Sequence, residues 1–268
     1  MTSIARSYLF VPGNRPERFE RACNADADAV IVDLEDAVPP DQKDQARASL
    51  AAWLSPAHPV LVRVNAAETP WHQADVALCR MPGVAGIVLP KAEHLDGELV
   101  DLCRDNGRVL LPLIETAVGF DRVRELAKTP HVQRLLFGSI DFQVDLGIDG
   151  EGDELLYFRS RLVLDSRIAG LQPPVDGVCT EIDDPEMLQA DTLRAKKLGF
   201  GAKLCIHPRQ VPLVNAAFAP TADEVAWAER VLSAAEKAAG AAVAVDGKMV
   251  DRPIILKAER IMKSTKRG

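Results

Sequence analysis

Two acidic residues, Glu115 and Asp141, follow neighbouring apolar runs of the chain and together could bind a metal ion. No histidine or cysteine stands at ligand spacing beside them. Carboxylate oxygens suit a hard ion that keeps open positions for water and substrate, which favours Mg²⁺, or Mn²⁺, over Zn²⁺. Two other interpretations are that Asp141 caps the following turn and that Glu115 pairs with Arg63 or Lys91. We expect the metal site.

Charged or polar side chains follow other apolar runs in the same way. Any one of them alone could be solvated surface charge. Several carboxylates gathered with Arg63 and Lys91 would be electrostatically unfavourable unless a cation and an anionic ligand lay between them. The set therefore predicts a metal together with an acidic substrate. Its members are Asp33, Glu35, Asp36, Arg63, Lys91, Glu115, Asp141, Asp176 and His207.

Apolar runs and longer amphipathic segments alternate along most of the chain, which is typical of parallel strands buried on both faces by helices. Eight such runs favour a closed (β/α)₈ TIM barrel over an open doubly wound sheet, although periodicity alone allows both. In such a barrel the carboxyl ends of the strands open on one end, here called the mouth. The runs cover residues 8–11, 29–34, 60–64, 86–89, 109–114, 134–137, 174–178 and 203–206, and helical patterns cover 15–24, 42–54, 95–105, 120–128, 155–168, 185–198 and 210–217.

The chain of 268 residues is about the length of one α/β barrel. We assign residues 1–220 to the barrel. A further helical pattern over residues 222–239 and the segment 245–253 exceed what a barrel needs. We predict that residues 221–268 form a C-terminal helix and arm of the same structural unit.

Composition excludes several classes of protein. The net charge is −7 and the basic residues are scattered, which argues against a nucleic-acid surface. Five widely spaced cysteines without a CxxC pair indicate neither a disulfide framework nor a zinc site. Apolar stretches end well short of the roughly 18 residues of a membrane span, and the N-terminus lacks a signal-peptide pattern. We expect a cytoplasmic enzyme that binds neither nucleic acid nor membrane.

A set of short motifs, in order over nearly the whole chain, resembles the citrate lyase β-subunit-like family, which also contains citramalyl-CoA and malyl-CoA lyases. No single motif is specific, but the ordered set is. The motifs are Arg6-Ser7-Tyr8-Leu9-Phe10-Val11-Pro12-Gly13, Asp33-Leu34-Glu35-Asp36-Ala37-Val38, Val62-Arg63-Val64-Asn65, Leu89-Pro90-Lys91, Ile114-Glu115-Thr116, Phe137-Gly138-Ser139-Ile140-Asp141 with Asp145-Leu146-Gly147, and Ile206-His207-Pro208-Arg209-Gln210.

This resemblance implies a TIM barrel, Mg²⁺ on Glu115 and Asp141, and Arg63 on the carboxylate or keto oxygen of the substrate. It also implies a homotrimer or larger ring in which an aspartate from a neighbouring subunit's C-terminal arm completes the site. That aspartate corresponds to Asp251. The expected reaction is cleavage of a 3-hydroxy-3-carboxy acyl thioester of the citramalyl-CoA, malyl-CoA or citryl type to an acetyl thioester and a 2-keto acid.

Within that hypothesis Asp251 is the base, and Lys91, Arg63 or a backbone amide stabilises the thioester enolate. We expect Glu35 and Asp36 to orient Arg63 or metal-bound water. Arg15, Arg18 and Arg21 follow the first strand and could meet the phosphates of CoA, although one solvated helix face explains them equally well. We interpret His207 as a hydrogen-bonded structural residue.

Three other functions would use much of the same site. The same compounds could be made by a synthase or hydrolysed by a thioesterase. The chain could be a citrate lyase subunit whose substrate is carried by an acyl carrier protein. A metal-dependent aldolase of free keto acids would share the fold and metal and ignore CoA.

Overall fold

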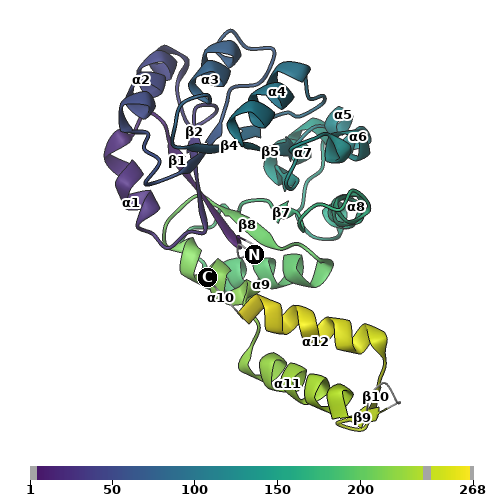
Figure 1. Ribbon diagram of the computed structural model, residues 1–268. Helices are drawn as coiled ribbons and strands as arrows, with labels where there is room; N and C mark the ends of the chain where they lie inside the picture. The colour runs from purple at the N-terminus through teal and green to yellow at the C-terminus, as the bar shows by residue number, and fades with distance from the viewer. Residues whose placement is uncertain (1–4, 238–242, 266–268) are drawn as a thin grey trace. The chain divides into compact units, whose positions relative to one another are not determined.

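The computed structural model describes residues 5–237 and 243–265, which belong to two compact units, residues 5–215 and the residues from 216 onward (Figure 1). The division falls within helix α10 (Gln210–Phe218). Residues 1–4, 238–242 and 266–268, which the predicted segments 1–220 and 221–268 include, lie outside the described residues.

The first unit is a closed barrel of parallel strands that follow one another in chain order. Each predicted apolar run overlaps one strand, so the TIM-barrel prediction is confirmed. Four strands are shorter than their predicted runs: β2 and β3 by one residue each, β6 by two and β7 by three. The strands are β1 (Ser7–Pro12), β2 (Ala29–Asp33), β3 (Val60–Arg63), β4 (Val84–Leu89), β5 (Val109–Ile114), β6 (Leu136–Phe137), β7 (Val175–Asp176) and β8 (Ala202–Cys205).

Helices surround the strands of the barrel (Figure 1). The helix expected over residues 15–24 is divided into a 3-10 turn, η1 (Pro16–Arg18), and α1 (Phe19–Cys23). Helices α3 (His72–Leu78) and α7 (Ser139–Leu146) were not predicted. The others are η2 (Pro40–Gln42), α2 (Lys43–Trp53), α4 (Gly97–Asn106), α5 (Ala117–Asp121), α6 (Val123–Lys128), η3 (Asp153–Leu155), α8 (Leu156–Ile168) and α9 (Pro185–Leu198). None of the described helices is long and apolar enough to cross a membrane.

Side chains from all eight strands pack together inside the barrel. Because successive side chains of a strand point to opposite faces, the residue two positions after an inward one also points inward. The packed members are Tyr8, Ile31, Leu61, Val88, Leu111, Leu113, Leu136, Val175, Ala202 and Leu204. Two positions after Ile31, Leu61 and Leu113 stand Asp33, Arg63 and Glu115. The strand period therefore places these three charges above the apolar interior, at the mouth.

The second unit is a helical hairpin with its own core. Helix α11 (Ala222–Lys237) is followed by the antiparallel strands β9 (Val243–Val245) and β10 (Lys248–Val250), and then by α12 (Arg252–Thr265). A two-residue turn joins the strands, and both of its residues, Asp246 and Gly247, have positive φ, as such tight turns require. The buried core consists of Ala228, Val231, Val250 and Ala258.

Candidate functional site

Arg63 is fixed at the mouth by Asp33 on the neighbouring strand. The register of β2 and β3 pairs the two residues directly. Arg63 Nε donates to Asp33 Oδ1 at 2.7 Å and Nη2 donates to Asp33 Oδ2 at 2.6 Å, while the guanidinium lies 4.9 Å from the centre of the Phe10 ring. Such a bidentate, stacked arrangement leaves the other guanidinium hydrogens for further partners.

Glu35 lies between Arg63 and Lys91. Its Oε2 is 3.0 Å from Arg63 Nη1, and its Oε1 accepts a hydrogen bond from Lys91 Nζ at 3.0 Å. Asp36 is more exposed and lies 3.6 Å from Arg63 Nη1. Burial raises the pKa of Glu35 to about 7, and Arg63 and Lys91 only partly oppose that rise. Arg63 therefore has Asp33 on one side and Glu35 on the other, and Glu35 links it to Lys91.

Glu115 carries a buried oxygen that no group of the described residues satisfies. Its Oε1 accepts a hydrogen bond at 2.6 Å from the backbone N–H of Lys91, whose φ of 46° is left-handed. Its Oε2 is buried without a hydrogen-bond partner. Burial raises the pKa of Glu115 to about 8, and the charges of Glu35 and Asp141 add to that rise. The second oxygen of this carboxylate is therefore available to a ligand.

Asp141 is not the end of a strand, as the sequence suggested. Strand β6 ends at Phe137, and Asp141 lies in the first turn of α7, exposed to solvent. The reason is that Gly138 starts a helix directly after the two-residue strand. Helix α7 has no side-chain cap at its N-terminus. The first turn of α7 thus brings both a carboxylate and backbone N–H donors to the vicinity of Glu115.

These residues fit a divalent cation. Glu115 Oε2 is a free, buried acceptor, and a cation there would offset the repulsion from Glu35 and Asp141 that raises the pKa of Glu115. Within residues 5–237 and 243–265, no group of three or more His, Cys, Asp or Glu side chains could hold a metal. An ion on Glu115 and Asp141 would therefore take its remaining ligands from water or substrate, as Mg²⁺ commonly does.

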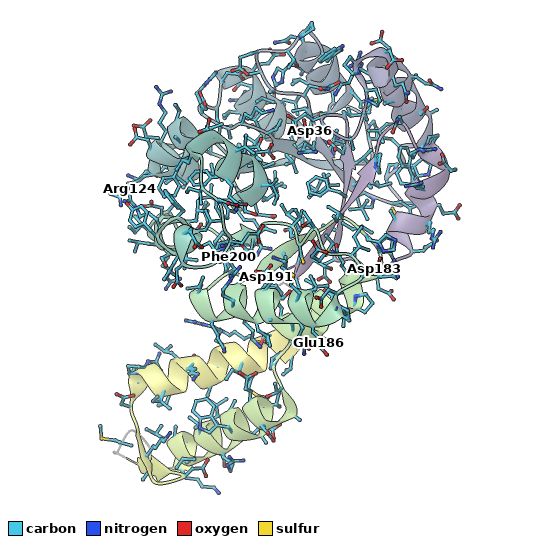
Figure 2. The ribbon with its side chains drawn as sticks, turned by 180° about the vertical axis from the view of Figure 1, so that it is seen from behind. Asp36, Arg124, Asp183, Glu186, Asp191 and Phe200 are labelled. Carbon is cyan, nitrogen blue, oxygen red and sulfur yellow. The ribbon has the colours of Figure 1, made fainter. Side chains whose placement is uncertain are left out.

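Asp176 does not face the mouth, which corrects the expectation from its place at a strand end. Val175 points into the barrel, so Asp176 points outward, where it is fully buried against Arg159 at 2.9 Å and Lys203 at 3.3 Å. Lys203 also forms an ion pair with Asp191, which is labelled on helix α9 in Figure 2. These charges hold the helix layer to β7 and β8.

The basic residues of the first helical segment are distributed over two places. Arg15 and Arg18 line a groove of about 570 Å³ together with Asn14 and Gln42, and both lie near Glu17. Arg21 is not part of that groove. Its charge, with burial and the charge of Arg209, lowers the pKa of His207, whose Nδ1 accepts from the backbone N–H of Arg209 at 3.1 Å.

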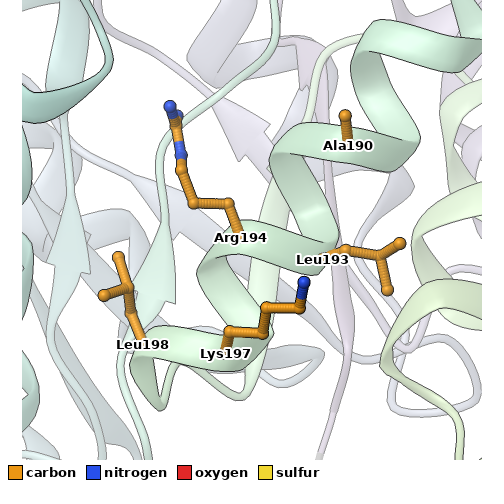
Figure 3. Close-up of a pocket in the computed structure, with 5 residues that line it drawn as sticks. All are labelled: Ala190, Leu193, Arg194, Lys197 and Leu198. Atoms are coloured by element: carbon orange, nitrogen blue, oxygen red, sulfur yellow. The ribbon is translucent and has the colours of Figure 1, made fainter.

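A hollow of about 400 Å³ lies on the surface of α9, and all five residues that line it belong to that helix (Figure 3). It contains no carboxylate and none of the groups described at the mouth. The lining residues are Ala190, Leu193, Arg194, Lys197 and Leu198. We therefore place the functional site at the mouth of the barrel.

Asp251 belongs to the C-terminal unit. It precedes α12, and its Oδ1 accepts a hydrogen bond of 3.3 Å from the backbone N–H of Ile254, as an N-terminal cap does. It is exposed. Its role as the base of the site stays a prediction.

Sequence reasoning missed two parts of the mouth. The sequence places Asp33 at a strand end but predicts no role for it, although the alternation of Ile31 and Asp33 marks it as an inward residue. Lys43 was read as part of an amphipathic helix, but it is buried and bonded to the loop after β2. No pattern of residue spacing in the sequence predicts this contact.

Comparison with known proteins shows what the chain is similar to. The sequence model of a family described as HpcH/HpaI aldolase/citrate lyase matches residues 6–208. A citrate lyase subunit beta-like protein of Deinococcus radiodurans is 36% identical over 280 residues, which cover 97% of each chain. A (3S)-malyl-CoA thioesterase of Cereibacter sphaeroides is 34% identical, over 96% of this chain and 93% of the relative.

A solved structure has the same arrangement over nearly the full length. It is protein CitE of Mycobacterium tuberculosis in complex with magnesium, acetoacetate and coenzyme A, with a TM-score of 0.86 and 33% sequence identity over 98% of both chains.

Proposed function

The chain belongs to the HpcH/HpaI aldolase/citrate lyase family, and from this premise we propose that it is a Mg²⁺-dependent carbon–carbon lyase of acidic acyl thioesters. The proposed substrate is a 3-hydroxy-3-carboxy acyl thioester of the citramalyl-CoA, malyl-CoA or citryl type. The products are an acetyl thioester and a 2-keto acid. The observation that carries this proposal is the unpartnered, buried Oε2 of Glu115, in the same mouth as Arg63 and Lys91.

Glu115 and Asp141 would hold the ion. When bound, Mg²⁺ supplies a Lewis acid that favours ionisation of the substrate hydroxyl and polarises the keto oxygen of the product. Arg63 binds the carboxylate of the substrate through the guanidinium hydrogens that Asp33 and Glu35 leave free. The uncapped first turn of α7 offers backbone N–H groups to the same anion.

The cleavage itself is a retro-Claisen step. A base removes the proton of the 3-hydroxyl, the bond between C2 and C3 breaks, and its electron pair moves to the thioester carbonyl as an enolate. Protonation of that enolate at C2 gives the acetyl thioester. We assign the base to Asp251 from a neighbouring subunit, and Lys91 or Arg63 to the enolate oxygen.

Arg15 and Arg18 in their groove, with Arg21, are the proposed contacts of the CoA phosphates. The related CitE structure contains coenzyme A, which supports a free CoA thioester over one on an acyl carrier protein. We further propose a homotrimer in the cytoplasm, so that each site receives its Asp251 from a partner.

Product analysis tests the proposal. Purified protein with Mg²⁺ should convert citramalyl-CoA or malyl-CoA to acetyl-CoA plus pyruvate or glyoxylate. If the metal-loaded protein leaves both CoA thioesters intact but cleaves a carrier-bound citryl group, the chain is a citrate lyase subunit. Cleavage of free keto-acid aldols alone would make it an aldolase.

Thioester hydrolysis is the second candidate, because the Cereibacter sphaeroides relative is a (3S)-malyl-CoA thioesterase. Hydrolysis of malyl-CoA yields malate and free CoA, and cleavage yields acetyl-CoA and glyoxylate. Chromatography of the products, with acetyl-CoA plus glyoxylate tested in reverse, separates lyase, thioesterase and synthase.

A further inference from the structure

Lys43 is buried behind the loop that follows β2, and neutral oxygens hold its ammonium group. The residue is 5% exposed. Its Nζ donates to the carbonyl oxygens of Leu34 and Glu35, both at 2.7 Å, and to Asn65 Oδ1 at 2.6 Å. An ammonium group has three hydrogens, so every donor has a partner. The ring of Trp71 lies 5.2 Å from the same nitrogen.

These three bonds join two loops of the mouth. Leu34 and Glu35 follow β2, and Asn65 follows β3. Asn65 strengthens the junction, because its Nδ2 also donates to the carbonyl oxygen of Leu34 at 2.9 Å and to the buried Asp75 Oδ2 at 2.6 Å. Burial of an ammonium group is costly, and a methionine of similar length could fill the same space. The three hydrogen bonds, rather than the volume of the side chain, are therefore what a lysine provides at this position and a methionine does not.

The fixed backbone carries the carboxylate that lies between the two cations of the mouth. Glu35 leaves the segment held by Lys43 and reaches Arg63 Nη1 and Lys91 Nζ, each at 3.0 Å. We propose that Lys43 is a positioning residue: by tying the backbone at Leu34 and Glu35 to Asn65, it holds the Glu35 carboxylate between Arg63 and Lys91. The Glu35 carboxylate in this position keeps Arg63 oriented toward the substrate carboxylate, an inference that rests on the proposed function.

Three variants separate an effect of Lys43 on the position of Glu35 from an effect on the stability of the protein. Lys43→Met removes the donors and keeps the length of the side chain. Lys43→Arg keeps a charge and some donors, but its planar group fits three converging acceptors poorly, so it should restore binding only in part. Leu50→Ala, at a fully buried position of the same helix, removes packing from α2 and leaves the three donors of Lys43 in place. Thermal unfolding shows whether Lys43→Met and Leu50→Ala lose comparable stability.

Calorimetric titration of pyruvate into the Mn²⁺-loaded proteins gives the decisive reading. We expect Lys43→Met to bind pyruvate about tenfold to a hundredfold more weakly than the unsubstituted protein, with Mn²⁺ affinity retained, and Leu50→Ala to bind both normally. Equal pyruvate affinity in folded Lys43→Met overturns the inference. If the unsubstituted protein binds Mn²⁺ but no keto acid, the proposed function fails instead. In that case a crystal structure of Lys43→Met still tests the inference about Lys43. If Glu35 remains between Arg63 and Lys91, the inference is overturned, and if Glu35 is displaced, the inference is supported.

Discussion

Asp33, on the adjacent strand, accepts two hydrogen bonds from one edge of the Arg63 guanidinium, from Nε at 2.7 Å and from Nη2 at 2.6 Å. Asp33 is almost fully buried and Arg63 largely so. We predict that Asp33→Asn lowers the free energy of unfolding by about 3 kcal/mol, because one partner of a buried ion pair is lost. The variant should also raise the KM for the acidic substrate. Chemical denaturation and steady-state kinetics measure the two effects, and unchanged KM would show that Asp33 does not orient Arg63 for binding.

Removal of either metal carboxylate should abolish tight metal binding. Glu115→Gln and Asp141→Asn are each expected to weaken Mg²⁺ binding by at least about tenfold, because each removes a charged ligand. Calorimetry with Mg²⁺, or electron paramagnetic resonance with Mn²⁺, measures this. Asp149→Asn, an exposed carboxylate shortly after the same helix, is a charge-matched control that should bind the metal normally. Full affinity in both ligand variants would exclude the site.

Stability without metal should fall as pH rises. The pKa of Glu115 is raised from 4.5 to about 8 by burial and by the nearby carboxylates. Between these values the folded protein keeps a proton that the unfolded chain releases, so the free energy of unfolding decreases with pH and levels off above the folded pKa. Glu35, raised to about 7, adds to the decrease.

Thermal unfolding in EDTA between about pH 5 and pH 9 measures this slope. Glu115→Gln should reduce it, and Mg²⁺ should stabilise the unsubstituted protein most at high pH, where no proton competes. A slope that Glu115→Gln leaves unchanged would assign the pH dependence to other groups.

Gly138 supplies the space that the Glu115 carboxylate needs. A Cβ atom at Gly138 would lie 2.6 Å from Glu115 Oε2 and 2.7 Å from its Cβ. Gly138→Ala should therefore displace the carboxylate and weaken metal binding and turnover. Gly97→Ala is the matched control, because a Cβ there meets nothing within 4 Å. Normal metal affinity in Gly138→Ala would mean that the carboxylate tolerates the shift.

Mixed subunits test the role of Asp251. Asp251→Asn and Glu115→Gln should each be inactive alone. If Asp251 enters a neighbour's site, co-refolded or co-expressed mixtures contain some sites with both native residues and regain partial activity. Mixtures of Asp251→Asn with Asp251→Ala should stay inactive. Absence of recovery in a confirmed mixed oligomer would place Asp251 in its own site or outside the mechanism.

The strands and most of the charged mouth follow from the sequence, because apolar runs and their period are local properties. The same local signal misread Asp141 and Asp176. A run of two strand residues before a helix looks like a longer strand, and whether Asp176 points inward depends on which residue of the pair enters the barrel. The role of Lys43 could not be predicted, because its partners Leu34, Glu35 and Asn65 come together only in the folded chain.

The charges of the mouth come from one continuous arc of the barrel. Asp33, Arg63, Lys91 and Glu115 stand on or shortly after strands β2 to β5, in that order, and Asp141 lies in the helix that follows β6. On β7 and β8 the charged residues Asp176 and Lys203 point away from the interior, where they pair with each other and with Arg159 of α8 and Asp191 of α9. Changes in the loops after β7 and β8 should therefore alter specificity for the acyl chain while the charged arc from β2 to β6 stays intact.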